Sequence, residues 1–399
     1  MSAGPLAGYR VLELGSTAAG PFCTRLLADF GADVVKIEPP EGDPIRHLGE
    51  QYEGKSLYAA TIARNKLIAS IDLRHPDGRA LLQRMLPAFD VVVENFRPGT
   101  LECWGLSYEA MCEIRPEIIL TRISGYGQDG PYAGRPGYGV IGEAVSGLRE
   151  MIGDPDRPPA RVAVPLTDYI AGVYSAFGTT MALLHRERTG KGQCIDTALS
   201  ESAFTFMESF VPAYGKLGKM GTRTGPRMPN SAPNTLYPTR DGKHILIAAL
   251  ADSIFRRLCG AMEQPDLGEH PLYSTQAARN ANEAGLDDII IAWTLGKDLL
   301  ELEHILQRAE VPASRVFTMQ DIFADPHYAA RQMLQRVEDE DIGEVTLAGV
   351  VPRMSATPGA IRWSGHRIGQ DTVIVLRELA QATDVEIAQL KGAGVIHCG

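Results

Sequence analysis

One aspartate stands where covalent chemistry is feasible. Asp168 closes the segment Ala-Val-Pro-Leu-Thr-Asp at residues 163–168 and precedes an uncharged stretch, residues 169–184. The spacing predicts a helix there, and an aspartate just before an apolar helix commonly caps it. The same position also suits a nucleophile, because the helix dipole keeps a carboxylate ionised while apolar surroundings remove its water. The residues alone leave both roles open.

The uncharged stretch itself predicts a buried helix and not a membrane span. Gly172, Gly178 and neighbouring Ser and Thr residues interrupt it, and it is already short for a bilayer.

A second candidate segment, residues 95–99, reads Asn-Phe-Arg-Pro-Gly. It directly follows a predicted strand, at the edge where a parallel sheet presents its ligand-binding loops. The aromatic ring suits stacking on an adenine, and the guanidinium suits two-point binding of a phosphate. The alternative is an ordinary Pro-Gly turn with a solvated Arg97 and with Phe96 in the core.

The first predicted turn, residues 15–21, lies between a strand and a helix, where nucleotides commonly bind. Glu38 ends the second strand, roughly where NAD enzymes hold the ribose with an acid. However, Gly15 and Gly20 do not form G-x-G-x-x-G, and no Gly-Lys-Ser/Thr follows. The turn therefore gives only weak support to an NAD site.

Alternating strands and helices are expected to position these residues. The strand-like runs are 10–14, 33–37, 68–73, 91–94 and 118–123, and the helical segments between them are 21–30, 76–85 and 107–114. This alternation is typical of a parallel sheet covered by helices, so we expect a Rossmann-like α/β half.

Beyond residue 215 the composition changes. Gly, Pro, Lys, Arg and Asn dominate residues 215–238, which indicates a linker or loop. A strand at 243–250 and helices at 253–262, 287–294 and 299–309 predict a smaller α+β domain. Strand-like segments at 344–347 and near Val350 then precede a closing helix at 372–381. We expect a large domain at 1–210, a linker at 211–235, a small domain at 236–330 and a return to the large domain at 331–399.

Composition excludes several classes of protein. The chain has 399 residues and a net charge of −10, which argues against nucleic-acid binding. Six cysteines lie far apart without a C-x-x-C pair, and the nine histidines include no H-E-x-x-H, so no metal site is expected. The first residues carry no export signal. Reduced thiols in a cytoplasmic protein, away from membranes, are the expected setting.

Several segments together resemble the class III CoA-transferase family, also called the CaiB/BaiF family. The matching segments are residues 31–40 with Gly42 and Asp43, 95–99, 124–131, 189–193 with Ile195 and Asp196, 325–327 with Ala330 and Arg331, and 368–372. The resemblance implies a large Rossmann-like domain built from both chain ends, a smaller domain, and an interlocked homodimer.

The resemblance also implies a chemistry. Asp168 matches the catalytic aspartate of the family, which would attack an acyl-CoA thioester and then carry CoA as an aspartyl-CoA thioester. The expected reaction moves CoA from a donor such as succinyl-CoA to a small organic acid, without a metal. Because Arg135, Arg161, Arg223 and Arg227 lie near the inferred pocket segments, we expect a dicarboxylate acceptor.

The expected CoA contacts follow the same resemblance: Ala18, Ile71, Arg74, Asn95, Phe96, Arg97, Gly125 and Tyr126. Tyr138 and Arg227 are candidates for the substrate pocket. The chain departs from the family at Cys103, where some members place a basic CoA contact. It also departs at residues 227–233, which replace the glycine-rich loop of the formyl-CoA enzymes.

Two alternatives stay open. The family fold also serves α-methylacyl-CoA racemases, but Tyr138 stands where their histidine would be, and a phenol is a poor base at neutral pH. The other alternative is a non-catalytic CoA-binding subunit of a hetero-oligomer, against which the retention of Asp168 argues.

Overall fold

The computed structural model describes residues 4–399 and divides them by internal contacts into two compact units. The first unit contains the chain up to Leu148, Val162–Lys219 and His327–Gly399. The second contains Arg149–Arg161 and Met220–Pro326. Residues 149–161 therefore join the second unit, although the sequence analysis assigned them to the large domain.

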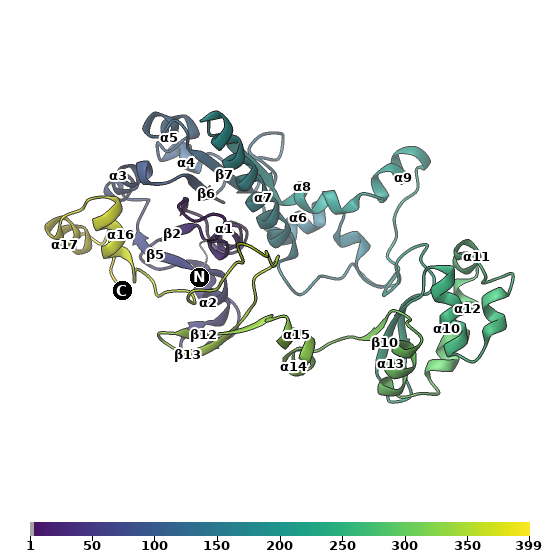
Figure 1. Cartoon of the computed structure of the whole chain (residues 1–399). Helices are drawn as coiled ribbons and strands as arrows, with labels where there is room; N and C mark the ends of the chain where they lie inside the picture. Colours follow the sequence, from purple (N-terminus) through teal and green to yellow (C-terminus); the bar gives the residue numbers. More distant parts are fainter. Residues whose placement is uncertain (1–3) are drawn as a thin grey trace. The chain divides into compact units, whose positions relative to one another are not determined.

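A seven-stranded sheet forms the centre of the first unit (Figure 1), in the order β14-β5-β2-β1-β6-β7-β8. Its strands are β1 (Arg10–Glu13), β2 (Asp33–Glu38), β5 (Lys66–Ile71), β6 (Val91–Glu94), β7 (Ile119–Ser124), β8 (Cys194–Ala198) and β14 (Ile396–His397). All neighbours pair in parallel except β14, which is antiparallel to β5. The predicted parallel α/β sheet is confirmed, and both chain ends contribute to it.

The strand order places a topological switch point beside β1, because the chain continues to β2 on one side and β6 lies on the other. Loops at the carboxyl ends of strands diverge at such a point and leave a crevice for ligands. The turn after β1 and the segment after β6 both lie there.

Helices cover both faces of the sheet. Successive strand residues point to opposite faces of the sheet, so Val11 and Leu12 of β1 lie in different buried clusters. Leu12 packs in the cluster that contains Leu376, and Val11 packs in the cluster that contains Cys23 and Ala171. The covering helices are α3 (Pro76–Met85), α16 (Thr372–Leu379) and α17 (Asp384–Gly392) on the first side, and α1 (Ala19–Asp29) and α7 (Leu166–Thr189) on the second.

Helix α7 corrects the expectation of a buried helix. Ala171, Ser175 and Thr179 are buried on the face toward the sheet, but Phe177 on the opposite face is 61% exposed. Val173, Tyr174, Met181 and Leu184 are also exposed. The absence of charge shows that a helix could be buried. It does not show which part of the helix surface is covered by the rest of the same chain.

Shorter elements complete the first unit. They are α2 (Leu57–Ile62), α4 (Thr100–Cys103), α5 (Tyr108–Ile114), α6 (Gly139–Val145), α8 (Leu199–Phe204), α9 (Phe210–Leu217) and α15 (Pro326–Ala330), with the hairpins β3 (Gln51–Tyr52) to β4 (Lys55–Ser56) and β12 (Leu334–Asp339) to β13 (Gly343–Ala348). Short 3-10 turns of the first unit occur at Pro44–His47, Leu86–Ala88 and Thr205–Met207, and those of the second unit occur at Arg149–Met151 and Pro265–Glu269.

The second unit has its own α+β core. Strands β9 (Asn234–Pro238), β10 (His244–Ala248) and β11 (Ala313–Arg315) form an antiparallel sheet. Its helices are α10 (Asp252–Ala261), α11 (Gln276–Ala281), α12 (Glu283–Thr294), α13 (Leu299–Arg308) and α14 (Met319–Ala324). Tyr237, Phe255, Ile290 and Leu302 are fully buried between them.

Two local predictions were wrong. Helix α9 occupies the start of the expected linker, because Phe210, Val211 and Tyr214 lie at helical spacing and Gly218 ends the helix in a left-handed conformation. The Val350 region forms no strand. The predicted closing helix at 372–381 is present as α16, and it is followed by α17 and β14, for which the sequence analysis gave no prediction.

Candidate active site

Asn95 connects the two loops at the switch point. Its Oδ1 accepts a hydrogen bond from Ser16 N at 2.7 Å, and its Nδ2 donates to Ser16 O at 2.9 Å. A Cβ on Gly15 would lie 2.9 Å from Asn95 Oδ1, and one on Gly20 would lie 3.3 Å from it. The two glycines of the first turn therefore make room for the Asn95 side chain.

Asp168 lies inside the first turn of α7. The helix begins at Leu166 after Pro165, and no side chain caps it. Of the two roles left open for Asp168, the N-cap is therefore wrong, because the helix starts three residues before the uncharged stretch. The carboxylate still lies at the positive end of the helix dipole, which favours its ionised form. It also lies directly against Gly139, the first residue of α6, where a side chain would collide with it.

A cavity of about 210 Å³ opens beside Asp168. Its lining comes from the first turn, from the loops after β6 and β7, and from the segment before α6: Ser16, Thr17, Ala18, Ala19, Asn95, Phe96, Arg97, Pro98, Ile123, Ser124, Gly125, Arg135, Pro136, Gly137, Tyr138 and Leu199, with Asp168. Its described lining contains two guanidinium groups and a phenol, but no histidine.

The loops around this cavity are held by close backbone contacts. A Cβ on Gly125 would lie 2.9 Å from Gly137 Cα, so both positions need glycine. Arg97 donates through its NH2 nitrogen to Gly134 O at 2.9 Å. The Arg135 guanidinium lies 3.6 Å from the centre of the Tyr132 ring, a cation–π contact. The partners that hold the two arginines at the cavity are thus a backbone carbonyl for Arg97 and an aromatic ring for Arg135, and neither partner is a carboxylate.

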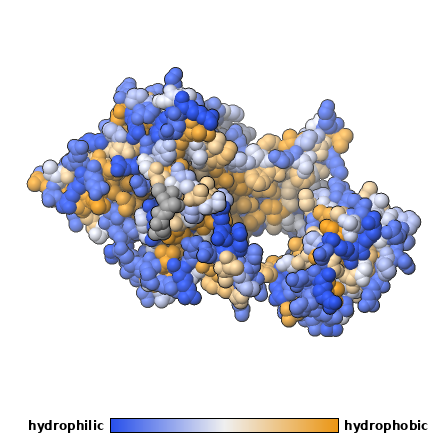
Figure 2. Space-filling model, in the orientation of Figure 1, coloured by the Kyte–Doolittle hydropathy of each residue, from blue (hydrophilic) through white to orange (hydrophobic). Residues whose placement is uncertain are grey.

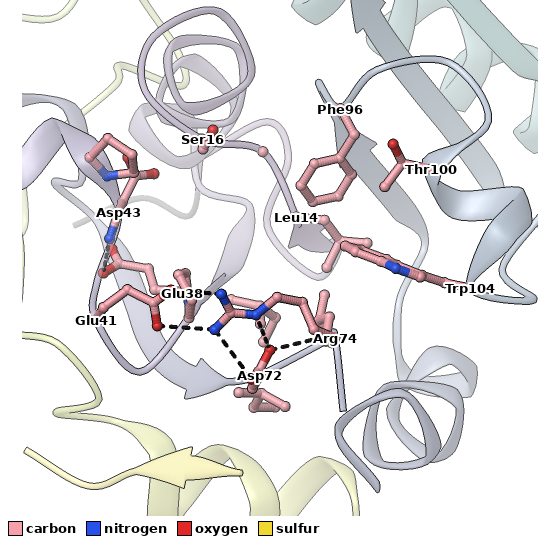
Figure 3. Close-up of a pocket in the computed structure, with 16 residues that line it drawn as sticks. Leu14, Ser16, Glu38, Glu41, Asp43, Asp72, Arg74, Phe96, Thr100 and Trp104 are labelled. Atoms are coloured by element: carbon pink, nitrogen blue, oxygen red, sulfur yellow. Dashed lines mark hydrogen bonds and ion pairs between the residues drawn. The ribbon is translucent and has the colours of Figure 1, made fainter. Parts of the chain in front are cut away.

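A second cavity, of about 340 Å³, lies on the other side of the first turn. It is lined by Leu14, Gly15, Ser16, Ile37, Glu38, Pro39, Glu41, Asp43, Pro44, Ile71, Asp72, Leu73, Arg74, Phe96, Thr100 and Trp104. Figure 3 shows the Phe96 and Trp104 rings on one side and the cluster of Arg74, Glu41 and Asp72 on the other. Ser16 and Phe96 line both cavities.

Arg74 is bound by two carboxylates. Its Nε lies 2.8 Å from Asp72 Oδ1 and its NH1 nitrogen lies 3.0 Å from Glu41 Oε1. The hydrogen bond from Arg74 lowers the pKa of Asp72. The Arg74 side chain is 61% exposed, so these exposed ion pairs are weak and can exchange for a phosphate.

Phe96 is held by its neighbours on both sides. Its ring lies 5.2 Å from Trp104, edge to face. Its backbone N–H donates to Glu94 Oε2 at 2.7 Å, and Glu94 Oε1 accepts from Arg122 Nε at 2.7 Å. Burial raises the pKa of Glu94 to about 7 although Arg122 lowers it. The sequence analysis missed Trp104. The only feature of the sequence that could have indicated it is its position shortly after the Asn-Phe-Arg segment.

The structure brings most of the predicted site residues into these two cavities. Ala18, Asn95, Phe96, Arg97, Gly125 and Tyr138 line the cavity of Asp168, and Ile71 and Arg74 join Phe96 in the other. Tyr126 lines neither and packs edge to face on Tyr132. Arg227 belongs to the second unit, where it forms an ion pair with Asp287.

Other candidate chemistry has a structural role or lacks the required groups. Both oxygens of Glu38, the weakly supported candidate for the ribose acid of an NAD site, bind Arg46 at 2.7 and 2.9 Å and are already engaged. Within residues 4–399, His, Cys, Asp and Glu side chains form no cluster of three or more that could hold a metal ion. Over the same residues, none of the helices combines the length and apolar character needed to cross a bilayer.

Comparison with known proteins identifies the class. The sequence profile of CoA-transferase family III matches residues 6–372. The chain therefore belongs to this family, and it is a CoA-transferase. A CaiB/BaiF family protein from Brucella suis has a crystal structure with a TM-score of 0.84 at 33% identity, over 95% of this chain and 100% of that one.

Two curated relatives from Chloroflexus aurantiacus are similar over 98% of both chains. Succinyl-CoA--D-citramalate CoA-transferase is 46% identical over 394 residues. The beta subunit of succinyl-CoA--L-malate CoA-transferase is 38% identical over 397 residues.

Proposed function

We propose that this chain moves CoA from succinyl-CoA to a small dicarboxylate, with Asp168 as the nucleophile. The observation that carries the proposal is the cavity in which Asp168 faces the loops after β1, β6 and β7, next to two arginines. The names of the two Chloroflexus relatives support the donor and the class of acceptor, since both combine succinyl-CoA with a hydroxydicarboxylate.

The reaction balances without a metal or ATP. A carboxylate oxygen of Asp168 attacks the thioester carbonyl, the C–S bond breaks, and a mixed anhydride and CoA thiolate form. The thiolate attacks the Asp168 carbonyl carbon, which releases succinate and leaves an aspartyl-CoA thioester. The acceptor carboxylate and then the thiolate repeat these attacks in reverse order, which regenerates the Asp168 carboxylate. The covalent intermediates divide one difficult exchange into easier steps.

CoA extends across both cavities in this proposal. The cavity with Phe96, Trp104, Ile71 and Arg74 takes the nucleotide end, because it offers aromatic faces and an exposed guanidinium. Ser16 and Phe96 line the passage to Asp168, where the thioester reacts. The contacts proposed around the thioester are Ala18, Asn95, Arg97 and Gly125, while Tyr126 lines neither cavity and packs on Tyr132 beside this loop.

Arg135 is the proposed partner for the second carboxylate of the acceptor. It lines the cavity of Asp168, whereas Arg223 and Arg227 form ion pairs with Glu150 and Asp287 inside the second unit. Tyr138, which is 75% exposed at the same cavity, is a proposed contact for the acceptor. A fixed guanidinium can bind a carboxylate through two parallel hydrogen bonds.

An interlocked homodimer in the cytoplasm is proposed as the working form. The outer face of α7 is apolar and exposed, α9 also exposes Val211, Tyr214 and Leu217, and apolar residues gather over the region of α7 and α8 (Figure 2). Exposed apolar surface of this extent indicates a protein interface. The cytoplasm is proposed because the six cysteines lie far apart in the sequence without a C-x-x-C pair, which is typical of proteins with reduced thiols.

The two alternatives make different predictions. A racemase needs two bases beside the α-carbon, and the described lining of the Asp168 cavity offers a phenol in place of a histidine. A hetero-oligomer is suggested by the malate enzyme, one of whose subunits is similar to this chain.

One incubation separates the three functions. The purified chain is mixed with succinyl-CoA and citramalate, malate, glutarate or acetate, in deuterated and in ordinary buffer, and the CoA esters are separated and weighed. A new dicarboxylyl-CoA without deuterium at the α-carbon is the expected result. Deuterium uptake without an acceptor would indicate a racemase. A chain that binds CoA but forms no new ester with any acid would contradict catalysis by this chain alone.

A further inference from the structure

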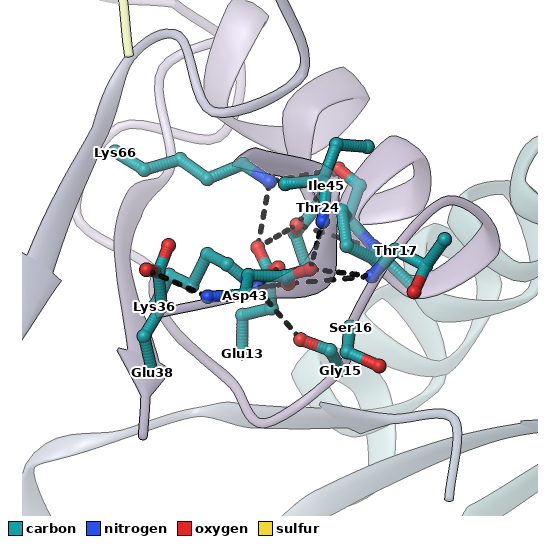
Figure 4. Close-up of polar contacts among 12 residues, drawn as sticks. Glu13, Gly15, Ser16, Thr17, Thr24, Lys36, Glu38, Asp43, Ile45 and Lys66 are labelled. Atoms are coloured by element: carbon teal, nitrogen blue, oxygen red, sulfur yellow. Dashed lines mark hydrogen bonds and ion pairs between the residues drawn. The ribbon is translucent and has the colours of Figure 1, made fainter. Parts of the chain in front are cut away.

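Four charged side chains are buried directly beneath the first turn. Glu13, Lys36, Asp43 and Lys66 each have at most 1% of their surface exposed. They come from β1, β2, the loop after β2 and β5, and Figure 4 shows them converging beside residues 15–17. The two lysines and two carboxylates balance in charge.

Lys36 contacts the turn directly. Its ammonium donates to Gly15 O at 2.7 Å and to Glu13 Oε1 at 2.9 Å, and it lies 2.7 Å from Asp43 Oδ2. Burial alone would lower the pKa of Lys36, but Asp43 and Glu13 raise it above its usual value. Lys36 is therefore a fixed cation with all three of its donors in use.

Asp43 holds the next part of the turn. It accepts hydrogen bonds from Thr17 N at 3.0 Å and from Ile45 N at 2.9 Å. Thr17 has a φ of 65°, a left-handed conformation that is strained for a β-branched residue and persists only when its surroundings enforce it. Asn95 binds Ser16 from the opposite side. Side chains from other elements thus hold four backbone atoms of the turn, which are Gly15 O, Ser16 N, Ser16 O and Thr17 N.

A purely structural role does not explain why charged groups are used here. Well-packed apolar side chains in place of a buried ion pair are often equally stable or more stable. However, apolar side chains could not hold a carbonyl and an N–H at fixed positions. The turn that these groups hold separates the two cavities, since Gly15 lines one, Ala18 the other and Ser16 both.

We propose that Lys36 and Asp43 are positioning residues for the transfer reaction, because they hold residues 15–18 in the conformation that shapes the path of CoA to Asp168. Neither residue lines the cavity of Asp168, and Asp43, which borders the other cavity, is almost fully buried there. The inference rests on the proposed reaction at Asp168.

The test removes the pair without leaving a lone buried charge. Lys36→Met with Asp43→Asn keeps an oxygen for Thr17 N–H but loses the contact to Gly15 O. The matched control is Arg64→Met with Asp29→Asn. That ion pair, 2.6 Å long and 1% exposed on both sides, lies at the other end of α1. Three quantities are measured for each protein: hydrogen exchange of the peptide that contains residues 15–18, KM for succinyl-CoA, and kcat per folded molecule.

We expect faster exchange in the turn and a kcat/KM lowered by about 10-fold to 100-fold in the Lys36 and Asp43 variant, since small misplacements at a reaction site cost up to about 100-fold. The control loses similar stability but keeps KM.

Unchanged exchange in the turn, or a kcat/KM within twofold of the control, would overturn the inference. If the double variant fails to fold, Asp43→Asn and Asp43→Ala are compared, and equal KM values for these two would also overturn it. A wild-type chain that forms no CoA ester contradicts the proposed function, while the exchange data still decide whether the pair holds the turn.

Discussion

The Asp168 carboxylate occupies the space where a side chain on Gly139 would begin. A Cβ built on Gly139 would lie 1.8 Å from Asp168 Oδ2 and 2.7 Å from Asp168 Cγ. Gly139 is the first residue of α6, and its φ is not positive, so backbone strain does not explain the glycine. The glycine is needed because the carboxylate approaches the backbone at this point. Two segments that are 29 residues apart in sequence therefore fix the orientation of one side chain.

Gly139→Ala should displace the carboxylate and lower kcat by about 100-fold, since a reacting group must lie within a fraction of an ångström of its productive position. The fold should survive, because alanine favours the helix at this position. Steady-state kinetics on the folded variant measure the effect. Gly134→Ala is the matched control, since no atom lies within 4 Å of its added Cβ. Equal kcat values for the two variants would contradict this account of Gly139.

The ion pairs of Arg74 predict effects of opposite sign on binding. Arg74→Gln should raise KM for succinyl-CoA by about tenfold, because a charged hydrogen-bond donor to phosphate is lost. Glu41→Gln should lower KM by up to about fivefold, because Arg74 no longer has to leave that carboxylate. Arg377→Gln removes a similarly exposed ion pair, with Asp384, and serves as the control. A higher KM in Glu41→Gln would show that Arg74 does not meet the substrate.

Glu94 predicts a pH dependence of stability. Burial raises its pKa in the folded chain to about 7 from an ordinary value of 4.5. Between these pH values the unfolded chain has lost the proton that the folded chain keeps, so the contribution of Glu94 to stability falls as pH rises and levels off above about 7. Urea unfolding at several pH values should show a free energy of unfolding that falls between pH 4.5 and about 7, both in the wild type and in Glu102→Gln. Glu94→Gln should lack this fall, and an unchanged slope in that variant would assign the pH dependence to other groups.

The exposed face of α7 predicts the effect of a charge on assembly. Phe177→Asp should convert the proposed dimer to monomers in sedimentation experiments, because a carboxylate would be buried without a partner in the interface. Val385→Asp places the same charge on α17, at a residue that is 69% exposed, and should leave the assembly unchanged. A Phe177→Asp protein that sediments like the wild type would mean that this face is not the interface.

The sequence predicted elements whose pattern is local. Strands β1, β2, β5, β6 and β7 appear as short apolar runs, and their alternation with helices was enough to predict the parallel sheet. It could not predict β14, because two residues carry no pattern and pair with β5 only after the chain returns to the sheet. Likewise α9 was missed because Pro212 and Gly215 outweighed its apolar spacing.

The candidate site was predictable to the extent that its residues follow strands. Asn95, Phe96 and Arg97 come directly after β6, so their place at the sheet edge followed from the topology. The contact between Gly139 and Asp168 and the ion cluster around Lys36 depend on side chains meeting in space. Nothing in the spacing of Lys36 and Asp43 indicates that both would be buried beneath the first turn.

The central claim is that Asp168 carries CoA, and the mass of the protein tests it most directly. The purified chain is incubated with succinyl-CoA, treated with hydroxylamine or borohydride, and weighed intact and after digestion. The account predicts a mass change on the peptide that contains Asp168, and none in Asp168→Asn. A wild-type chain that forms a new CoA ester with no modification at Asp168, or with one at another residue, would contradict it.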